Sequence, residues 1–434
     1  MITLEFKLKG KEIQYRIVDE MIRTFQFVRN KCLGFWMDGY KVAEGDRTRS
    51  CPNAFGQGRA VKLSEVNAEA TRVRHNPEWE WAGKLESSSA QAASERAMSA
   101  IRRYYENCKA KIPGNIGFPK FQKNNRSVEY KVAGWKLSPD RKRITFTDKF
   151  KAGTFKLVGS YDLNFYHLKA IKRVRIVRRS DGYYCQFCVA VERNISINPT
   201  TGKCLGIDVG LSKFYTASDG SSIENPRYLR KAERALKRVQ RRVSSKFRKP
   251  KKKGEKVKQS NNYKKACKRL GKKHLTVQRR RKDFVVKTAK ALLESSNFIA
   301  YEKLNVKKLV KNRKLSKSIS DAAWTQFTGW IERYGMLYKR PVVAVPPQYT
   351  SQDCSGCGTR VKKTLSVRTH ICPNSKCQLV IDRDENAAVN ILVKGLNIAG
   401  IVLNSSTVGQ TGINASGQTN LCLLGENLAD KWTG

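Results

Sequence analysis

Two kinds of hydrophobic pattern divide the first half of the chain. Residues 1–15 alternate polar and apolar positions, which predicts a strand or hairpin. From about Val18 to Cys108 the apolar positions recur every three or four residues, which predicts helices, and Pro and Gly in residues 111–119 end that pattern. Short alternating segments from about Phe118 to Asn194 predict a small β-barrel or curved sheet. If residues 1–15 belong to that sheet, the helical block is an insertion in a β domain.

The pattern changes again near Lys203. We expect strands at LGIDVG and FYTASDG and at residues 297–304 and 341–346, with a helix from about Ser320 to Lys339 between the last two. Residues 227–293 predict an antiparallel pair of helices separated by a lysine-rich break. The apolar seam expected for the first of these helices is Leu229, Ala232, Leu236, Val239 and Val243. The polar tail, residues 405–434, has few aromatic residues, so we expect little order there.

The charge indicates a polyanionic partner. The chain of 434 residues has 86 Lys and Arg against 36 Asp and Glu, a formal net charge of +50, and residues 227–290 hold 28 of these cations against three acids. Neutralised phosphates release condensed counterions, so a nucleic acid is the expected partner, with a ribosome-associated protein as the alternative. No apolar run approaches the roughly 18 to 20 residues of a membrane span. The N-terminus has no signal-peptide pattern. We therefore expect a cytoplasmic, nucleoid-associated protein that binds no membrane.

One predicted strand carries a dense group of cations. They are Lys172, Arg173, Arg175, Arg178 and Arg179. They predict a strongly basic exposed face, and the alternative is a solvated edge strand.

Four cysteines have the spacing of a zinc ribbon. Cys354 and Cys357 form one pair, Cys372 and Cys377 form another, and 14 residues join the pairs. Four thiolates suit a closed tetrahedral Zn²⁺ site. Such a site has no open position for a substrate, so we expect this zinc to be structural, with iron–sulfur or redox use as the alternative.

Three carboxylates follow or begin predicted elements. Asp208 and Glu302 each end an apolar strand, and Asp384 opens the helix ENAAVNIL, where an N-cap acid would be expected in any case. In an RNase H-like sheet these three positions converge. Clustered carboxylates repel one another, and divalent cations relieve that repulsion. Two Mg²⁺ ions (or Mn²⁺) about 4 Å apart would then support phosphodiester hydrolysis.

At these residues the sequence resembles the TnpB family of transposon-associated RNA-guided nucleases, which is related to type V CRISPR effectors. The resemblance rests on GIDVG, YEKL, SKSISDAAW, TSQDCSGCG and DRDENAAVNI, and FPKFQK at 118–123 extends it. It is dense from about 203 to 395 and rests mainly on order and length in residues 16–117. The four-residue gap between Cys372 and Cys377 departs from the family, which usually has two residues there.

The resemblance implies an α/β multidomain fold. Residues 201–349 and 379–404 would form an RNase H-like RuvC nuclease domain that contains the basic helical hairpin 227–293, and residues 350–378 would form a zinc-ribbon insertion that binds the target nucleic acid. Residues 1–15 and 118–200 would form a wedge β-barrel domain, interrupted by a helical recognition domain at 16–117.

The resemblance also implies an activity. Asp208, Glu302 and Asp384 would be the catalytic, magnesium-binding triad, with Asp382 as the rival for the third place. The protein would bind a transposon-encoded guide RNA, recognise a short transposon-adjacent motif and cleave double-stranded target DNA at a single site. The residues that read this motif cannot be carried over; Gln91 is a weak candidate. The oligomeric state is open, with a monomer favoured.

Three other functions remain open at this point. A nuclease-inactive RNA-guided repressor would lack one of the acids. A transposase would use the same triad for strand transfer, and an unguided RNase H-like nuclease would act on junctions or hybrids.

Overall fold

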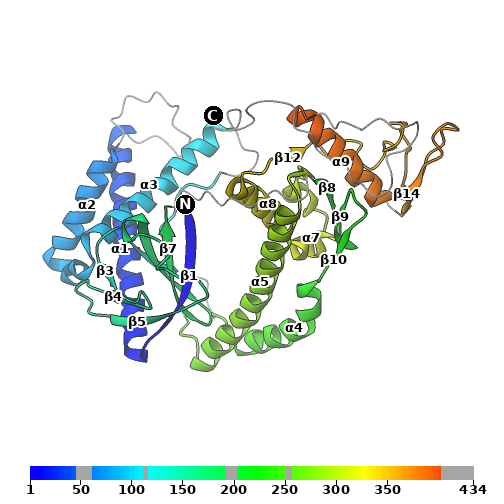
Figure 1. Cartoon of the computed structure of the whole chain (residues 1–434). Helices are drawn as coiled ribbons and strands as arrows, with labels where there is room; N and C mark the ends of the chain where they lie inside the picture. The colour runs from blue at the N-terminus through cyan, green and yellow to red at the C-terminus, as the bar shows by residue number, and fades with distance from the viewer. Residues whose placement is uncertain (45–60, 111–115, 191–202, 251–256, 365, 402–434) are drawn as a thin grey trace. The chain divides into compact units, whose positions relative to one another are not determined.

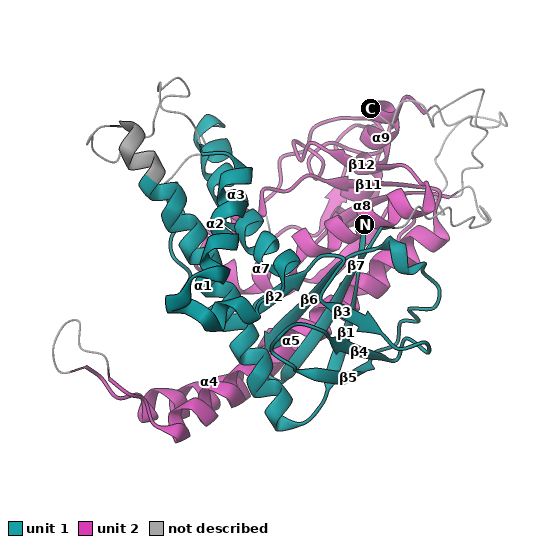
Figure 2. Cartoon of the chain, turned by 90° about the vertical axis from the view of Figure 1, so that its left-hand side faces the viewer, with its two compact units in different colours: residues 1–192 teal, residues 193–434 magenta. Residues whose placement is uncertain are grey.

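A computed structural model describes the whole chain except residues 45–60, 111–115, 191–202, 251–256, 365 and 402–434 (Figure 1). The chain divides into two compact units, Met1–Glu192 and Arg193–Gly434, which are coloured separately in Figure 2. The tail expected to have little order, 405–434, lies outside the described residues. Within the described residues, no helix is both long enough and apolar enough to cross a membrane.

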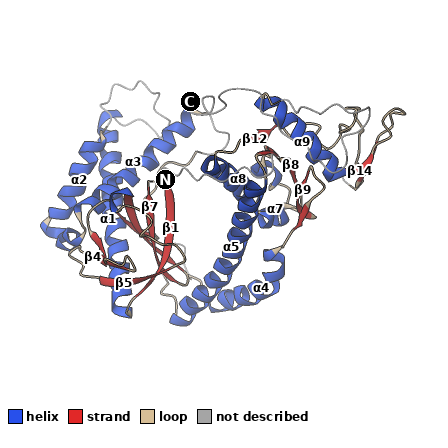
Figure 3. Cartoon of the chain, in the orientation of Figure 1, coloured by secondary structure: helices blue, strands red, loops and turns tan. Residues whose placement is uncertain are grey.

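The first unit combines one sheet with a block of helices (Figure 3). Its strands are β1 (Ile2–Lys9), β2 (Ser127–Tyr130), β3 (Trp135–Leu137), β4 (Arg143–Phe146), β5 (Gly153–Val158), β6 (Ile171–Arg179) and β7 (Gly182–Val189). Its helices are α1 (Glu12–Glu44), α2 (Leu63–His75) and α3 (Ser87–Lys109), with short 3₁₀ helices η1 (Pro77–Lys84) and η2 (Leu168–Ala170). The strand predicted for residues 1–15 ends earlier, at Lys9, because the alternating pattern gives way to helical spacing from Glu12 onward.

The strands of this sheet pair in the order β2-β6-β7-β1-β5-β4-β3. β1 pairs antiparallel with β5 and β7, so the N-terminal strand joins strands that follow the helices in sequence. Among the described residues β2 and β3 do not pair, so the hydrogen bonds do not close the predicted barrel. The apolar core explains why the sheet stays open. Residues of α1, α2 and α3 share one apolar cluster with the strands, so these helices bury the inner face of the sheet. In a closed barrel the strands on the opposite side would bury that face.

The cations on β6 are bound by acids of the same unit. Arg173 and Arg175 contact the carboxylate of Glu129 at 2.7 and 2.8 Å, and Arg96 of α3 contacts it at 2.6 Å. Burial acts to raise the pKa of Glu129, but the three guanidinium groups outweigh it and hold that pKa at about 2.

The end of β6 is paired in the same way. Arg178 contacts Asp19 at 2.8 Å, and Arg179 pairs with Glu5. β6 lies between β2 and β7 in the sheet. The alternative of a solvated edge strand was therefore wrong. The four arginines of β6 form ion pairs within the unit, although the side chains of Arg173, Arg175 and Arg178 remain 37–42% exposed.

The second unit is a five-stranded sheet with helices on both faces. Its strands are β8 (Cys204–Val209), β9 (Lys213–Ala217), β10 (Ser222–Glu224), β11 (Phe298–Glu302) and β12 (Val342–Val345), in the order β10-β9-β8-β11-β12. β8, β9 and β10 form an antiparallel meander, and β11 runs parallel to both β8 and β12.

The helices of this unit are α4 (Tyr228–Lys246), α5 (Asn261–Ser295), α6 (Val306–Leu309), α7 (Ser316–Ala322), α8 (Trp324–Tyr338) and α9 (Arg383–Ala399). Of these, α5, α8 and α9 cover the sheet. One apolar cluster joins Leu205, Ile207 and Ile299 to residues of α5 and α8, and the other joins Cys204, Phe298 and Ala300 to residues of α9. Strand side chains alternate between the two faces of a sheet, and the two clusters contain alternate residues of β8 and β11. Helix α9 therefore lies on one face of the sheet, and α5 and α8 lie on the other. The single helix expected at Ser320–Lys339 is broken at Ala323, whose φ is 58°.

Candidate metal-dependent nuclease site

Asp208 and Glu302 stand side by side at the ends of two parallel strands. Ile207 of β8 is the register partner of Tyr301 of β11, and each acid is the next residue along its strand. Register partners in neighbouring strands point to the same face. Gly206 and Ala300 are also partners, so both acids lie on the face that α9 covers.

Helix α9 lies directly on these two strands. A Cβ at Gly206 would come within 2.1 Å of the backbone oxygen of Ala388, and a Cβ at Gly395 would come within 2.4 Å of Ala300 Cβ. Asp384 precedes Ala388 by one helical turn, and Asp208 follows Gly206 by two strand residues; both steps are about 6 Å. The close crossing therefore brings the first turn of α9, with Asp384, over Asp208.

The electrostatics agree with this placement. Burial raises the pKa of Asp208 well above its ordinary value, and the charges of Glu302 and Asp384 raise it further. Burial also raises the pKa of Glu302, against the lowering effect of a hydrogen bond from Thr350 and the charge of Lys394. The charge of Asp208 is thus opposed by the charges of two other acids. Carboxylate oxygens are the ligands that Mg²⁺ and Mn²⁺ take, and such an ion would relieve both the repulsion and the cost of burial, although among the described residues only the four cysteines already bring their ligand atoms within 4.8 Å of one another.

Asp382 and Asp384 have different surroundings. Asp382 is the N-cap of α9, and its Oδ1 accepts hydrogen bonds from the backbone N–H groups of Asp384 and Glu385 at 2.8 and 3.3 Å. The expectation that Asp384 itself stands at the N-cap was therefore wrong. Asp384 lies two residues further along, in the first turn of α9, and Asp382 serves as the cap.

Two arginines beside the acids were missed in the sequence. Arg368, directly before β13 (Thr369–Ile371), contacts the carboxylate of Asp384 at 3.7 Å, and Arg383 acts to lower the pKa of Asp208. Arg368 lies 16 residues before Asp384, and only the pairing of β13 with β14 (Val380–Asp382) brings the two together. No spacing rule in the sequence could have identified it.

The four cysteines form a compact cluster. Their Sγ atoms all lie within 4.8 Å of one another; Cys354 and Cys377 are 3.8 Å apart, and Cys357 and Cys372 are 3.4 Å apart. A tetrahedron with Zn–S bonds of about 2.3 Å has sulfur atoms about 3.8 Å apart, so the four thiolates fit Zn²⁺. Hydrogen bonds with Thr359 lower the pKa of Cys357 to about 6, whereas burial raises the pKa of Cys372 to about 12. A bound Zn²⁺ would hold all four sulfur atoms as thiolates. The wider gap between Cys372 and Cys377 does not prevent the four sulfur atoms from meeting.

A stripe of polar residues on α9 holds the chain that enters this cysteine cluster. Asn386 is fully buried, donates to the backbone oxygen of Asp353 at 2.8 Å, and accepts from the N–H of Ser355 at 2.9 Å. Asn390 donates to the backbone oxygens of Asp353 and Thr350 at 2.7 and 2.9 Å.

The stripe also reaches the sheet acids. Lys394 donates to the backbone oxygen of Gln348 at 2.7 Å, and Thr350 hydrogen-bonds Glu302. Segment 348–355 therefore links the first cysteine pair, helix α9 and Glu302 through hydrogen bonds.

Helices α4 and α5 form the long basic hairpin. The predicted seam of α4 is confirmed, since Leu236 and Val243 are buried and Leu229, Ala232 and Val239 are partly buried, while the intervening arginines and lysines are exposed. Part of the lysine-rich break between the two helices, 251–256, lies outside the described residues.

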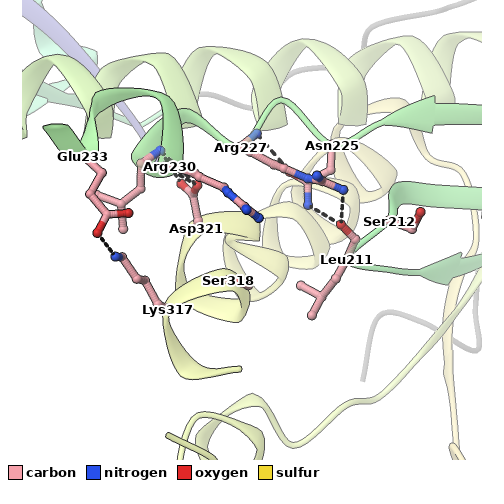
Figure 4. A pocket seen from close by; sticks show the side chains of 10 residues that line it. Leu211, Ser212, Asn225, Arg227, Arg230, Glu233, Lys317, Ser318 and Asp321 are labelled. Atoms are coloured by element: carbon pink, nitrogen blue, oxygen red, sulfur yellow. Dashed lines mark hydrogen bonds and ion pairs between the residues drawn. The ribbon is translucent and has the colours of Figure 1, made fainter. Parts of the chain in front are cut away.

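A polar pocket of about 500 Å³ marks the start of this hairpin (Figure 4). Asp321 of α7 accepts from the N–H of Leu229 at 2.9 Å and from Arg281 Nε at 2.9 Å, and Glu233 pairs with Lys317. These bonds fix the first turn of α4 to α5 and α7. The SKSISDAAW segment, which carried part of the family resemblance, thus anchors the basic hairpin.

Two segments of the chain match known protein families. Residues 186–313 match the OrfB_IS605 family, described as a probable transposase, and residues 324–391 match the Cas12f1-like TNB domain. These matches confirm the resemblance to TnpB that the motifs predicted.

Relatives and a solved structure extend the comparison. A putative RNA-guided DNA endonuclease of Streptomyces pristinaespiralis is 37% identical over 207 residues, which are 47% of this chain and 48% of that protein. The putative RNA-guided DNA endonuclease InsQ of Escherichia coli (strain K12) is 26% identical and covers 69% of this chain and 73% of its own length. The chain thus spans about half the length of the first relative.

The fold has a counterpart among solved structures. The Cas12f1 chain of a Cas12f1–sgRNA–target DNA complex aligns with a TM-score of 0.50 and 14% identity, over 88% of this chain and 83% of that chain. The class that emerges is a mixed α/β, multidomain protein with the fold of a Cas12f-type effector, a TNB-domain match and a four-cysteine cluster.

Proposed function

We propose that this protein is an RNA-guided DNA endonuclease that cleaves target DNA by metal-dependent phosphodiester hydrolysis. The observation that carries the proposal is the convergence of Asp208, Glu302 and Asp384 on one face of the sheet. The strand order β10-β9-β8-β11-β12, with a meander followed by two parallel strands, is the order of an RNase H-like sheet and supports a RuvC-type nuclease domain. The names of the relatives support the guide RNA and the DNA target.

In this proposal the three carboxylates hold Mg²⁺ or Mn²⁺, and the ions supply an activated water and stabilise the leaving oxygen. The chain's own residues position the acids: Thr350 orients Glu302, and the Asp382 cap fixes the first turn of α9. Arg368, beside Asp384, is placed to bind a phosphate of the substrate. The four cysteines hold a structural zinc, and the α4–α5 hairpin binds phosphate backbone.

The domains follow from the same proposal. The zinc ribbon, 350–378, would be an insertion in a nuclease domain formed by 201–349 and 379–404. The β domain and its helical insertion, 16–117, would hold the guide RNA and read the adjacent DNA motif. We propose a monomer in the cytoplasm, associated with the nucleoid.

The test is guide-dependent cleavage. The protein is purified from cells that carry its native locus, the co-purifying RNA is sequenced, and plasmid DNA matching the guide is incubated with Mg²⁺. We expect a defined RNA and cleavage that Asp208→Ala abolishes. A defined RNA with binding but no cleavage by the wild type would instead indicate an RNA-guided repressor. Absence of any specific RNA would overturn the proposal in favour of a transposase or an unguided nuclease.

A further inference from the structure

The first unit contains an open cavity of about 760 Å³ that the proposed nuclease chemistry does not use. Its floor is one stripe of α1, and its walls come from η1 and from the FPKFQK segment. The lining residues are Gln26, Phe27, Asn30, Lys31, Gly34, Phe35, Asp38, Glu69, Trp79 and Phe121. The α1 members recur at spacings of three or four residues, so they form a continuous face of that helix.

One wall is a cluster of aromatic rings. Phe27 packs edge-on against Trp79, with 5.3 Å between ring centroids, and against Trp81 at 4.7 Å. Lys31 Nζ lies 3.8 Å from the centre of the Trp79 ring. This wall therefore combines aromatic surface with a positive charge held against it.

The opposite wall is Phe121, whose backbone is held in place on both sides. Asn30 donates to the backbone oxygen of Gln122 at 2.8 Å and accepts from its N–H at 2.9 Å. Arg29, itself buried, donates to the backbone oxygen of Lys120 at 2.9 Å. The next anchor along the chain is Asn125, whose N–H donates to Gln26 at 2.7 Å.

These bonds fix a loop whose large apolar side chain is not buried. Phe121 remains 52% exposed, although full burial of a phenylalanine ordinarily stabilises a protein. Gly34 lies below the ring: a Cβ there would be 3.8 Å from it. A rigid, exposed aromatic face over a cavity is the arrangement that proteins use to stack an unpaired base.

We propose that this cavity binds one unpaired nucleotide of a single-stranded nucleic acid, with its base stacked on Phe121. The volume suits a nucleotide-sized ligand. The amide nitrogen of Gln26 and the carboxylate of Glu69 line the cavity with groups that can face a base edge, while Lys31 and the exposed lysines beside Phe121, Lys120 and Lys123, suit its phosphate.

An apolar side chain of a protein partner is the competing occupant. The exposed lysines beside the ring, Lys120 and Lys123, favour a nucleotide, because its phosphate would give them a counter-charge that an apolar side chain lacks.

The first measurement is ultraviolet cross-linking. The full-length protein is irradiated with its co-purifying RNA and, separately, with random-sequence RNA and DNA 20-mers, and the peptides are analysed by mass spectrometry. We expect nucleotide adducts on the peptides that contain Phe121 or Trp79. The mass of the adduct, ribonucleotide or deoxyribonucleotide, identifies the strand that supplies the base.

The second measurement is affinity for the same 20-mers. Phe121→Ala removes the ring on which one base would stack, so this variant should bind the 20-mers about ten-fold more weakly. Phe121→Trp should keep the wild-type affinity, and so should Phe165→Ala, which removes another exposed phenylalanine of this unit (73% exposed). Thermal melting of each variant shows whether the fold is kept.

Equal affinity of wild type and folded Phe121→Ala, or adducts confined to other peptides, would overturn the proposal. If Phe121→Ala binds the 20-mers as tightly as the wild type does, and a protein binds the wild type but not Phe121→Ala, the cavity is a binding site for a protein partner. Because the 20-mers need neither a guide nor cleavage, this test can succeed or fail independently of the proposed nuclease function.

Discussion

At the scale of single residues, the environment of Asp208 links catalysis to stability. Its carboxylate is buried beside two other acids, so its ionised form destabilises the folded protein whenever no metal is bound. We therefore predict that Asp208→Asn lowers DNA cleavage by at least about a thousand-fold, because a metal ligand is lost. Gel assays of guided cleavage measure this effect, and RNA affinity, measured in parallel, should be unchanged. Loss of RNA binding in the same variant would contradict a purely catalytic role.

The same substitution should raise stability when Mg²⁺ is absent. The folded-state pKa of Asp208 lies above the unfolded value of about 4, so its contribution to stability is full at low pH and is lost as the pH rises through the folded pKa. At pH 7 an uncharged Asn removes that cost. We expect the melting temperature to rise by roughly 2–4 °C, the shift that about 1 kcal/mol gives in a unit of this size.

The measurement is differential scanning fluorimetry at pH 7 without chelator, so that zinc is retained. Addition of Mg²⁺ or Mn²⁺ should raise the melting temperature of the wild type and leave that of Asp208→Asn nearly unchanged. A variant less stable than the wild type in metal-free buffer would show that the three carboxylates do not repel one another as described.

At the scale of elements, helix α9 supports both the cysteine cluster and the proposed magnesium site. Its first turn carries Asp384, and Asn386 binds the backbone on both sides of Cys354. Replacing Asn386 with Ala leaves the partly buried N–H of Ser355 without its acceptor and removes one of the two donors to the backbone oxygen of Asp353, which costs roughly 1–3 kcal/mol. We expect Asn386→Ala to lower both the melting temperature and the cleavage rate, by about ten-fold or more for cleavage.

A matched control lies on the same helix. Asn397 is exposed, so Asn397→Ala should change neither quantity. Zinc content, measured with a colorimetric chelator on the denatured protein, separates two explanations: full zinc occupancy with slow cleavage in Asn386→Ala indicates displacement of Asp384, whereas lost zinc indicates failure of the ribbon. Unchanged cleavage would show that the hydrogen bonds do not position the acid.

Loss of zinc from the cysteine cluster should act through the hydrogen bonds that join segment 348–355 to α9 and Glu302. Cys357→Ser leaves three thiolates, which weakens the site and loosens segment 348–355. We predict lower zinc content, a lower melting temperature and slower cleavage, with Mg²⁺ unable to restore the rate. As a control, Cys267→Ser changes a cysteine of α5 that is not in the cluster and should behave as the wild type. Normal cleavage by zinc-free Cys357→Ser would contradict the connection.

At the scale of the whole molecule, the excess of positive charge is divided between internal pairs and exposed surface. The arginines of β6 contact Glu129, Asp19 and Glu5, whereas Arg234, Arg238 and Arg241 of α4 are exposed. We predict that changing these three α4 residues together to Gln weakens RNA binding and reduces the slope of log K against log salt by about 2. Filter binding at several salt concentrations measures the slope.

The contrast is a variant of the first unit. Arg178→Gln removes a cation already paired with Asp19, so it should leave the slope nearly unchanged. Equal slopes for the wild type and the α4 variant would show that the hairpin does not bind the phosphate backbone.

The sequence by itself determined the features that depend on neighbouring residues. The short apolar runs in LGIDVG and NFIAYEKL predicted β8 and β11, because a strand covered on both faces buries consecutive residues. The 3–4 spacing after Leu229 predicted α4, because buried side chains of a helix recur with its period. The cysteine spacing predicted the four-sulfur cluster, since short loops hold each pair of ligands together. These predictions needed no knowledge of distant contacts.

Only the tertiary structure decided which distant groups meet. Glu129 neutralises arginines on another strand, Asp382 rather than Asp384 caps α9, and Arg368 reaches Asp384 through the pairing of β13 with β14. The sequence allowed a β-barrel or a curved sheet in the first unit, and the helices that pack on that sheet leave it open. The local sequence around a charged residue is the same whether or not a distant residue pairs with that charge. The local sequence of a strand is likewise the same whether another strand or a helix lies beside it. The packing of the whole fold decides which distant residues become these partners.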